Sequence, residues 1–123
     1  MYVSDSAQDA RAQALEARWA ARVSVSQRFD FGAVDEQGKA VPVPLPNEPT
    51  LAQMISDHMV VGTPDRCIEQ LRRIDSTLRL DHFNASFWFG DLDHARVLRS
   101  IELFAREVMP AFETAVDQDS MAP

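Results

Sequence analysis

The sequence is poor in cysteine and has no long uninterrupted apolar stretch. The single cysteine, Cys67, excludes an internal disulfide and is typical of a protein from a reducing compartment. Asp5, Asp9 and Arg11 interrupt the amino-terminal residues before an apolar segment can form, so we expect neither a signal peptide nor a membrane span. The sequence therefore predicts a cytoplasmic protein that does not associate with membranes.

An excess of basic charge is also missing. The formal net charge is −7 and the isoelectric point is about 4.8, and the basic residues are scattered among Asp and Glu. Nucleic-acid binding requires a clustered basic face, so we expect no nucleic-acid partner. The 123 residues, with 46% hydrophobic and 25% charged, are instead typical of one globular domain.

Apolar periodicity and capping residues predict strands that alternate with helices along the chain. The predicted elements are a short strand at 1–4, a helix from about 7 to 28, a loop at 29–49, helices at 50–57 and 64–78, a strand at 80–90 and a helix at 93–108. A polar tail follows at 113–123. This order favours a parallel α/β arrangement, but so little strand cannot complete a parallel sheet.

The predicted loop at 29–49 is unusually long for a compact domain. It contains two glycines and four prolines, and alternate prolines remove amide donors and favour an extended course: Gly32, Gly38, Pro42, Pro44, Pro46 and Pro49. Connections of this length are usually lids, binding loops or disordered segments.

The stretch VVGTPDRCIEQL, residues 60–71, has two interpretations. A helix amino terminus at Thr63 and Pro64 can bind a phosphate, or these residues can simply start a helix well. Glycine-rich phosphate-binding motifs are missing and Asp65 would repel an anion, so we favour the capping role. Cys67 lies on the apolar stripe of this helix, and we expect a small buried hydrophobic residue rather than a reactive thiol.

The three histidines show no spacing typical of a metal site. Asp91, Asp93 and His94 are close in sequence, but they are more simply explained as the start of the last helix. We therefore predict no metal centre.

The end of the last predicted strand, within FNASFWFGD, is the candidate ligand site. Parallel α/β proteins bind their ligands at the carboxyl ends of strands, which here carry Phe87, Trp88, Phe89 and Gly90. Core packing is the competing explanation, and we favour it for Phe83 and Phe87. Packing explains Trp88 and Gly90 less readily.

Taken together, VVGTPDRCIEQL and HFNASFWFGDLDHARVLRSIELFAREVMPAF resemble the carboxyl-terminal end of the luciferase-like flavin-dependent monooxygenases. In that family a VG(T/S)P-type helix start is followed by a hydrophobic strand, a glycine-containing turn and a helix ending in F-x-x-x-V-x-P. The residues that match are Val61, Gly62, Thr63, Pro64, Phe104, Val108 and Pro110. YVSDSAQDAR also resembles the family's penultimate strand-to-helix passage.

The resemblance implies that residues 1–112 are the carboxyl-terminal part of a TIM (β/α)8 barrel, incomplete in this chain because a whole barrel takes about 250 residues. It implies a monooxygenase that uses reduced FMN and O₂ on a small organic substrate, with a separate flavin reductase as a possible partner. The family's strands that hold most flavin phosphate contacts and catalytic histidines have no counterpart here, so no catalytic residue is assigned and the isolated chain is expected to be inactive.

The resemblance also implies that residues 29–49 are a lid over the flavin, in which Arg28 and Lys39 meet an anionic group. For each of these two residues, solvated surface charge is the favoured alternative. A different reading of the whole chain is a free-standing small α/β module without flavin chemistry. On the monooxygenase reading the predicted strand keeps an exposed edge, so we expect the isolated chain to self-associate or to be a loosely packed monomer that binds hydrophobic dyes. A compact monomer would favour the module.

Overall fold

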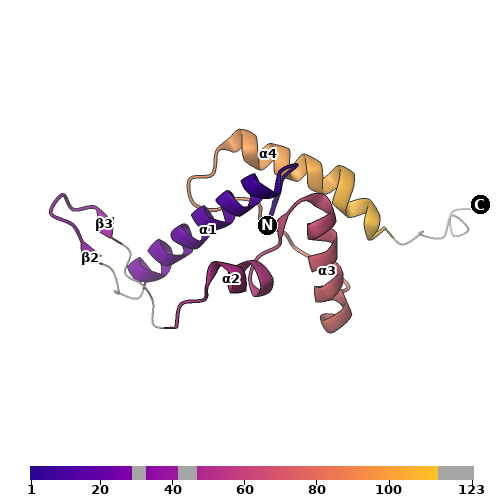
Figure 1. Ribbon diagram of the computed structural model, residues 1–123, viewed down its shortest axis with the longest axis horizontal. Coiled ribbons are helices and arrows are strands. Elements are labelled where there is room, and N and C mark those ends of the chain that lie inside the picture. Colours follow the sequence, from indigo (N-terminus) through magenta and orange to yellow (C-terminus); the bar gives the residue numbers. More distant parts are fainter. Residues whose placement is uncertain (29–32, 42–46, 114–123) are drawn as a thin grey trace, which may run out of the picture.

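A computed structural model describes residues 1–28, 33–41 and 47–113 (Figure 1). These form a small, mixed, helix-rich domain. The strands are β1 (Tyr2–Val3), β2 (Ala33–Val34), β3 (Ala40–Val41) and β4 (Val61–Gly62). The helices are α1 (Ala7–Arg28), α2 (Leu51–Asp57), α3 (Pro64–Leu78) and α4 (His94–Leu103), and α4 continues into a π-helical turn (Phe104–Val108) and a 3₁₀ turn (Met109–Ala111).

The centre of the fold is a parallel pair of strands, β1 and β4. Tyr2 lies opposite Val61, and the amides of Tyr2 and Ser4 donate to the carbonyls of Val60 and Gly62 at 2.9 and 3.0 Å. The short strand predicted at 1–4 is therefore confirmed, whereas β4 is a strand that the sequence analysis did not identify.

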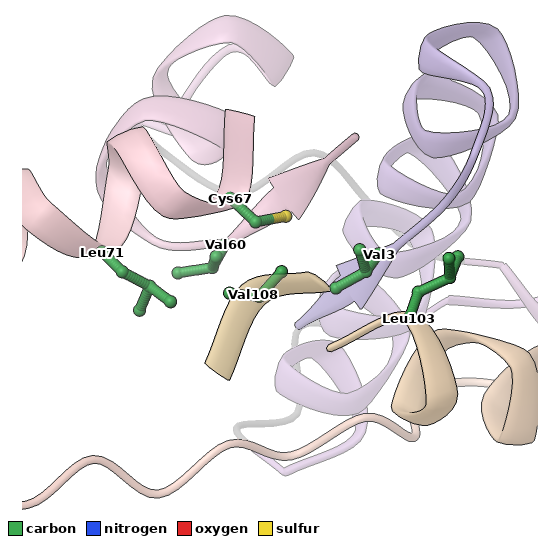
Figure 2. Close-up of a cluster of buried hydrophobic side chains, with 6 residues drawn as sticks. All are labelled: Val3, Val60, Cys67, Leu71, Leu103 and Val108. Atoms are coloured by element: carbon green, nitrogen blue, oxygen red, sulfur yellow. The ribbon is translucent and has the colours of Figure 1, made fainter. Parts of the chain in front are cut away.

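Successive side chains of a strand point to opposite faces, and both faces of this pair are covered by helices. Val3 and Val60 face one side, where they join a cluster with α3 and the carboxyl-terminal helix (Figure 2). Tyr2 and Val61 face the other side, against α1 and α2. The first cluster comprises Val3, Val60, Cys67, Leu71, Leu103 and Val108, and the second comprises Tyr2, Ala10, Ala14, Leu51 and Val61.

Side chains from the helices close both outer edges of the pair. The Val3 amide, which points away from β4, donates to the Oγ of Ser100 on α4 at 2.8 Å. The Val61 amide donates to the Oε1 of Gln70 on α3 at 3.0 Å, and Gln70 also donates from Nε2 to the carbonyl of Ile55 at 3.1 Å. Because Ser100 and Gln70 are buried, each satisfies a main-chain donor that would otherwise be costly.

The predicted helix boundaries agree closely with the structure because their signals are local. Thr50 caps α2 in a reciprocal arrangement with Gln53, in which each side chain bonds the other's amide. Pro64 occupies the first turn of α3, and Thr63 has an extended backbone there without a side-chain capping bond. The helix start is confirmed, but the hydroxyl cap is not formed.

The apolar residues of the last helix predict one buried side, which carries Val97, Leu98, Ile101, Phe104 and Val108. Part of this prediction is wrong. Val108 is fully buried, whereas Leu98 and Ile101 are 53% and 40% exposed. The helix contacts β1 through the side that carries Ser100 and Leu103, so the apolar residues beside that side have no described neighbour to cover them.

The strand predicted at 80–90 is also wrong as a sheet element. Residues 82–89 form no ladder with another described strand. The predicted alternation is present only in part. Ala85, Phe87 and Phe89 are half-buried while Asn84, Ser86 and Trp88 are exposed, but Phe83, which belongs to the predicted apolar face, is 39% exposed. Alternation makes one face apolar, but a ladder needs a partner along the edge.

The described part of the predicted loop contains an antiparallel hairpin, β2–β3, beyond the carboxyl end of α1 (Figure 1). Asp35 organises its turn, since Oδ1 accepts from the amides of Gln37 and Lys39 at 2.9 and 2.8 Å. Residues 29–32 and 42–46 of the predicted lid, and 114–123 of the predicted tail, lie outside the described residues. Among the described helices none is long and apolar enough to cross a membrane.

Candidate functional site at the carboxyl end of β1

The carboxyl end of β1 is the place where a parallel α/β protein presents its functional groups. Here the chain leaves the strand at Ser4 and turns into α1, while the first turn of α4 approaches from a distant part of the sequence. Asp9, in the first turn of α1, is the residue on which the polar contacts converge.

Three donors reach the two carboxylate oxygens of Asp9. The Tyr2 hydroxyl and the Ser4 hydroxyl both donate to Oδ2 at 2.8 Å. Arg96 donates from Nη1 to Oδ1 at 2.5 Å. The network therefore joins the strand, the helix that follows it and a helix more than eighty residues away, and it fixes their relative positions.

The network also sets the ionisation of its members. Burial opposes the charge on Asp9, but the hydrogen bonds from Tyr2, Ser4 and Arg96 outweigh it and hold the pKa of this carboxyl below its ordinary value. Burial, together with the bond to Asp9, raises the pKa of Tyr2. At neutral pH the site therefore contains a carboxylate, a neutral phenol and a guanidinium.

A shallow hollow of about 310 Å³ opens beside this network. Its lining includes Tyr2, Ser4, Asp9 and Arg96, together with Arg99, which donates to Asp5 at 2.9 Å. Both arginines of the hollow are therefore already bonded to carboxylates of the same chain.

A second hollow, of about 270 Å³, shares Arg96 with the first. Phe89 and Gly90, two of the sequence-predicted site residues, line it together with acidic residues. The Phe89 ring meets the Tyr2 ring edge-on, with centroids 6.3 Å apart. The structure thus brings Phe89 and Gly90 to the carboxyl end of β1.

Backbone geometry explains why residue 90 is glycine. Its φ of +56° lies in the left-handed region, and a Cβ there would lie 3.1 Å from the Cβ of Ala20 on α1. The glycine therefore permits both a tight turn and close packing against α1, and no ligand is needed to account for it.

The other two aromatic candidates lie away from both hollows. Phe87 packs against the first core cluster, with its ring 5.3 Å from that of Phe104 in an edge-on arrangement. Core packing thus accounts for Phe87. Trp88 is 69% exposed and lies on the opposite face of the extended segment.

The lid candidates are not part of these hollows. Lys39 lies exposed at the turn of the β2–β3 hairpin, and the side chain of Arg28 lies outside what the structure describes. Near the end of the predicted lid, Glu48 accepts from Arg22 through both carboxylate oxygens, at 2.7 and 2.5 Å. This paired contact anchors the end of the segment to α1.

The remaining chemically reactive residues do not form a second site. Cys67 is fully buried, as expected, and burial raises the pKa of its thiol to about 12, which makes it unreactive at neutral pH. Among the residues that the structure describes, no group of three His, Cys, Asp or Glu side chains is placed to hold a metal ion.

Sequence reasoning did not identify Asp9, Arg96 or the hydroxyl of Tyr2 as site residues. The Ser-Asp-rich turn after the first strand was a usable signal for Asp9, because such turns sit at the carboxyl ends of strands. Arg96 lies 87 residues from Asp9, and no local pattern connects the two.

Within the described part of the chain, the two hollows at the carboxyl end of β1 offer no unpaired cation for a flavin phosphate. A flavin phosphate would have to displace Asp9 from Arg96 and Asp5 from Arg99, and these two carboxylates would repel it. The two hollows are also shallow and lie at or below the lower end of the usual size range for ligand pockets, about 300 to 1,000 Å³. No protein-family model, curated protein or solved structure matches the chain.

Proposed function

We propose that this chain is the carboxyl-terminal part of a luciferase-like flavin-dependent monooxygenase. In this proposal the complete barrel uses reduced FMN and O₂ to oxidise a small organic substrate, and a separate reductase supplies the reduced flavin. The chain alone is inactive because its own residues do not form a flavin site.

The observation that carries the proposal is the repeated order of an extended stretch followed by a helix. β1 precedes α1, β4 precedes α3, and the extended residues 82–89 precede α4. Repeated β–α steps with parallel strands are the building unit of a (β/α)8 barrel.

The position of the extended segment supports the same view. The amino group of Met1 donates to the carbonyl of Ser86 at 2.7 Å, and the Tyr2 ring meets the Phe89 ring. These two contacts bring Ser86 and Phe89 close to β1, although residues 82–89 form no ladder with it. A barrel requires such a segment to lie beside the neighbouring strand.

Uncovered apolar surface on the helices is a second supporting observation. Leu15 and Trp19 on α1 are 46% and 50% exposed, and Leu98 and Ile101 on α4 are similarly uncovered. Large exposed apolar residues that gather on helices are typical of surfaces that contact further protein.

The polar network would then serve as part of the wall at the carboxyl end of the barrel. Asp9 and Arg96 hold α1 and α4 against β1, and Phe89 and Gly90 contribute one side of the hollow above them. Flavin binding itself requires strands that this chain does not supply.

A specific observation favours the alternative, a free-standing α/β self-association module. In a closed barrel both edges of every strand are bonded to other strands. Here the outward amides of Val3 and Val61 are bonded to Ser100 and Gln70 of the same chain. At these positions the outer edges of the two strands are therefore hydrogen-bonded without any further strand.

The coding DNA upstream of the Met1 codon separates the two functions. The monooxygenase proposal expects an in-frame continuation that encodes an FMN-binding half-barrel, and it expects the longer product to consume O₂ with reduced FMN. A promoter and ribosome-binding site directly before Met1 would instead support the module and would contradict the proposal.

A further inference from the structure

Residues 82–88 form no ladder with a described strand, but the exposure of the side chains alternates along 84–88 as it does in a strand. The carbonyl of Ser86, bonded to Met1, points towards β1. Backbone groups of a strand alternate between its two edges, so the amides and carbonyls of Phe83, Ala85 and Phe87 point the other way. Among the residues that the structure describes, none of these outward groups has a hydrogen-bond partner.

The sequence of this segment is nearly symmetric about Ala85. Read in either direction from Ala85, it gives a small polar residue, then phenylalanine, then a large aromatic or imidazole ring. When two copies run antiparallel with their Ala85 residues opposite each other, Phe83 lies opposite Phe87, and Asn84 lies opposite Ser86. Each residue then meets a chemically matched one.

The backbone geometry allows this centre of symmetry. In an antiparallel pair, residues that exchange hydrogen bonds alternate with residues that do not. The outward-facing residues 83, 85 and 87 would pair as 83 with 87, 85 with 85 and 87 with 83, which gives about six hydrogen bonds at two per bonded pair. Centring the pair on Asn84 or Ser86 would also keep the outward groups paired, but Phe83 would then no longer lie opposite Phe87.

Charge and burial also match. The chain carries a net charge of −7, yet residues 83–90 contain no acidic or basic side chain. Trp88, which is 69% exposed, would come opposite His82 of the second copy. The pairing therefore places no like charges opposite each other within residues 83–87. It also gives the exposed Trp88 ring a neighbouring side chain.

From these observations we propose that two copies of this chain form an antiparallel dimer by pairing residues 82–88 across a two-fold axis at Ala85. The dimer is a property of the 123-residue chain and does not rest on the proposed monooxygenase function. A single pair of strands is a small interface, so the affinity is in the micromolar range and the dimer is reversible.

Two double variants at the exposed positions 84 and 86 test the register. Asn84→Lys with Ser86→Lys places lysine opposite lysine twice, whereas Asn84→Lys with Ser86→Glu places lysine opposite glutamate twice. Sedimentation equilibrium of the full chain over about 10 to 500 µM, a range chosen around a micromolar dimer, should show a dimer for the unmodified chain. It should weaken roughly tenfold in the first variant and persist in the second.

The matched pair of variants controls for folding, since both change the same two exposed side chains. A strictly monomeric unmodified chain, or equal dimerisation of the two variants, would overturn the proposal. If either double variant fails to fold, oxidative crosslinking decides. Asn84→Cys mixed with Ser86→Cys should form a disulfide-linked dimer much faster than either variant alone, and equal rates in the mixture and the separate variants would refute the register.

Discussion

The hydroxyl of Tyr2 and a carboxylate oxygen of Asp9 lie 2.8 Å apart, and this hydrogen bond joins β1, which contributes to both core clusters, to the first turn of α1. Arg96 of α4 bonds the other oxygen of the same carboxylate. The network therefore links three elements through one side chain, and it makes clear predictions about stability.

Replacement of Tyr2 with phenylalanine should destabilise the protein by about 1 kcal/mol, the usual net contribution of one hydrogen bond. Chemical denaturation measures this loss. The control is the same change in an Asp9→Asn background, where the cost should be clearly smaller because the charged acceptor is gone. Equal costs in both backgrounds would show that the Tyr2–Asp9 bond contributes nothing.

Asp9 should make stability depend on pH in acid. Because its pKa in the folded state lies below the ordinary value of 3.8, its contribution is complete well above that value and is lost as pH falls through the folded pKa. Thermal unfolding from about pH 5 down to about pH 2 should show a steeper loss of stability for the unmodified protein than for Asp9→Asn. Parallel pH profiles would contradict the lowered pKa.

Replacement of Ser100 with alanine should cost about 1 to 3 kcal/mol, because it leaves the buried Val3 amide without an acceptor. The control is Ser24→Ala on the exposed side of α1, which should change stability by less than about 0.5 kcal/mol. A small effect at Ser100 would mean that water or another strand bonds this edge of β1.

Gly90→Ala should destabilise more than Gly38→Ala, although both glycines have positive φ. The left-handed backbone costs about 1 kcal/mol at either position, but only residue 90 has a neighbour, Ala20, that a new methyl group would press against. Denaturation of the two variants measures the difference, and equal losses would argue against close packing of this turn on α1.

Trypsin should cut at Lys39 before it cuts at Arg72 or Arg73. Lys39 lies at an exposed turn between strands of two residues each, whereas both arginines lie within the long helix α3, which packs on the core. Timed digestion with mass spectrometry identifies the first fragment. Cleavage in α3 at the same rate would contradict the expected order.

The helices could be predicted from the sequence because capping residues and apolar periodicity act over one or two turns. Thr50 with Gln53, and Pro64 at the start of α3, are such local signals. β4 could not be predicted because two residues are too few to show an alternation of apolar and polar side chains. The strand predicted at 80–90 is wrong because such alternation does not show whether a neighbouring strand is present to form a ladder. Of the candidate site, Phe89 and Gly90 were found from their place after an extended stretch, whereas Arg96 meets Asp9 only through tertiary packing.

The central claim is that this chain is part of a flavin-dependent barrel and cannot bind flavin alone. A calorimetric titration of FMN into the 123-residue chain, run beside the longer product of any in-frame upstream sequence, tests it most directly. The account predicts a dissociation constant of micromolar order or tighter for the longer product and no binding at that level for the isolated chain. Micromolar binding by the isolated chain, or none by the longer product, would contradict it.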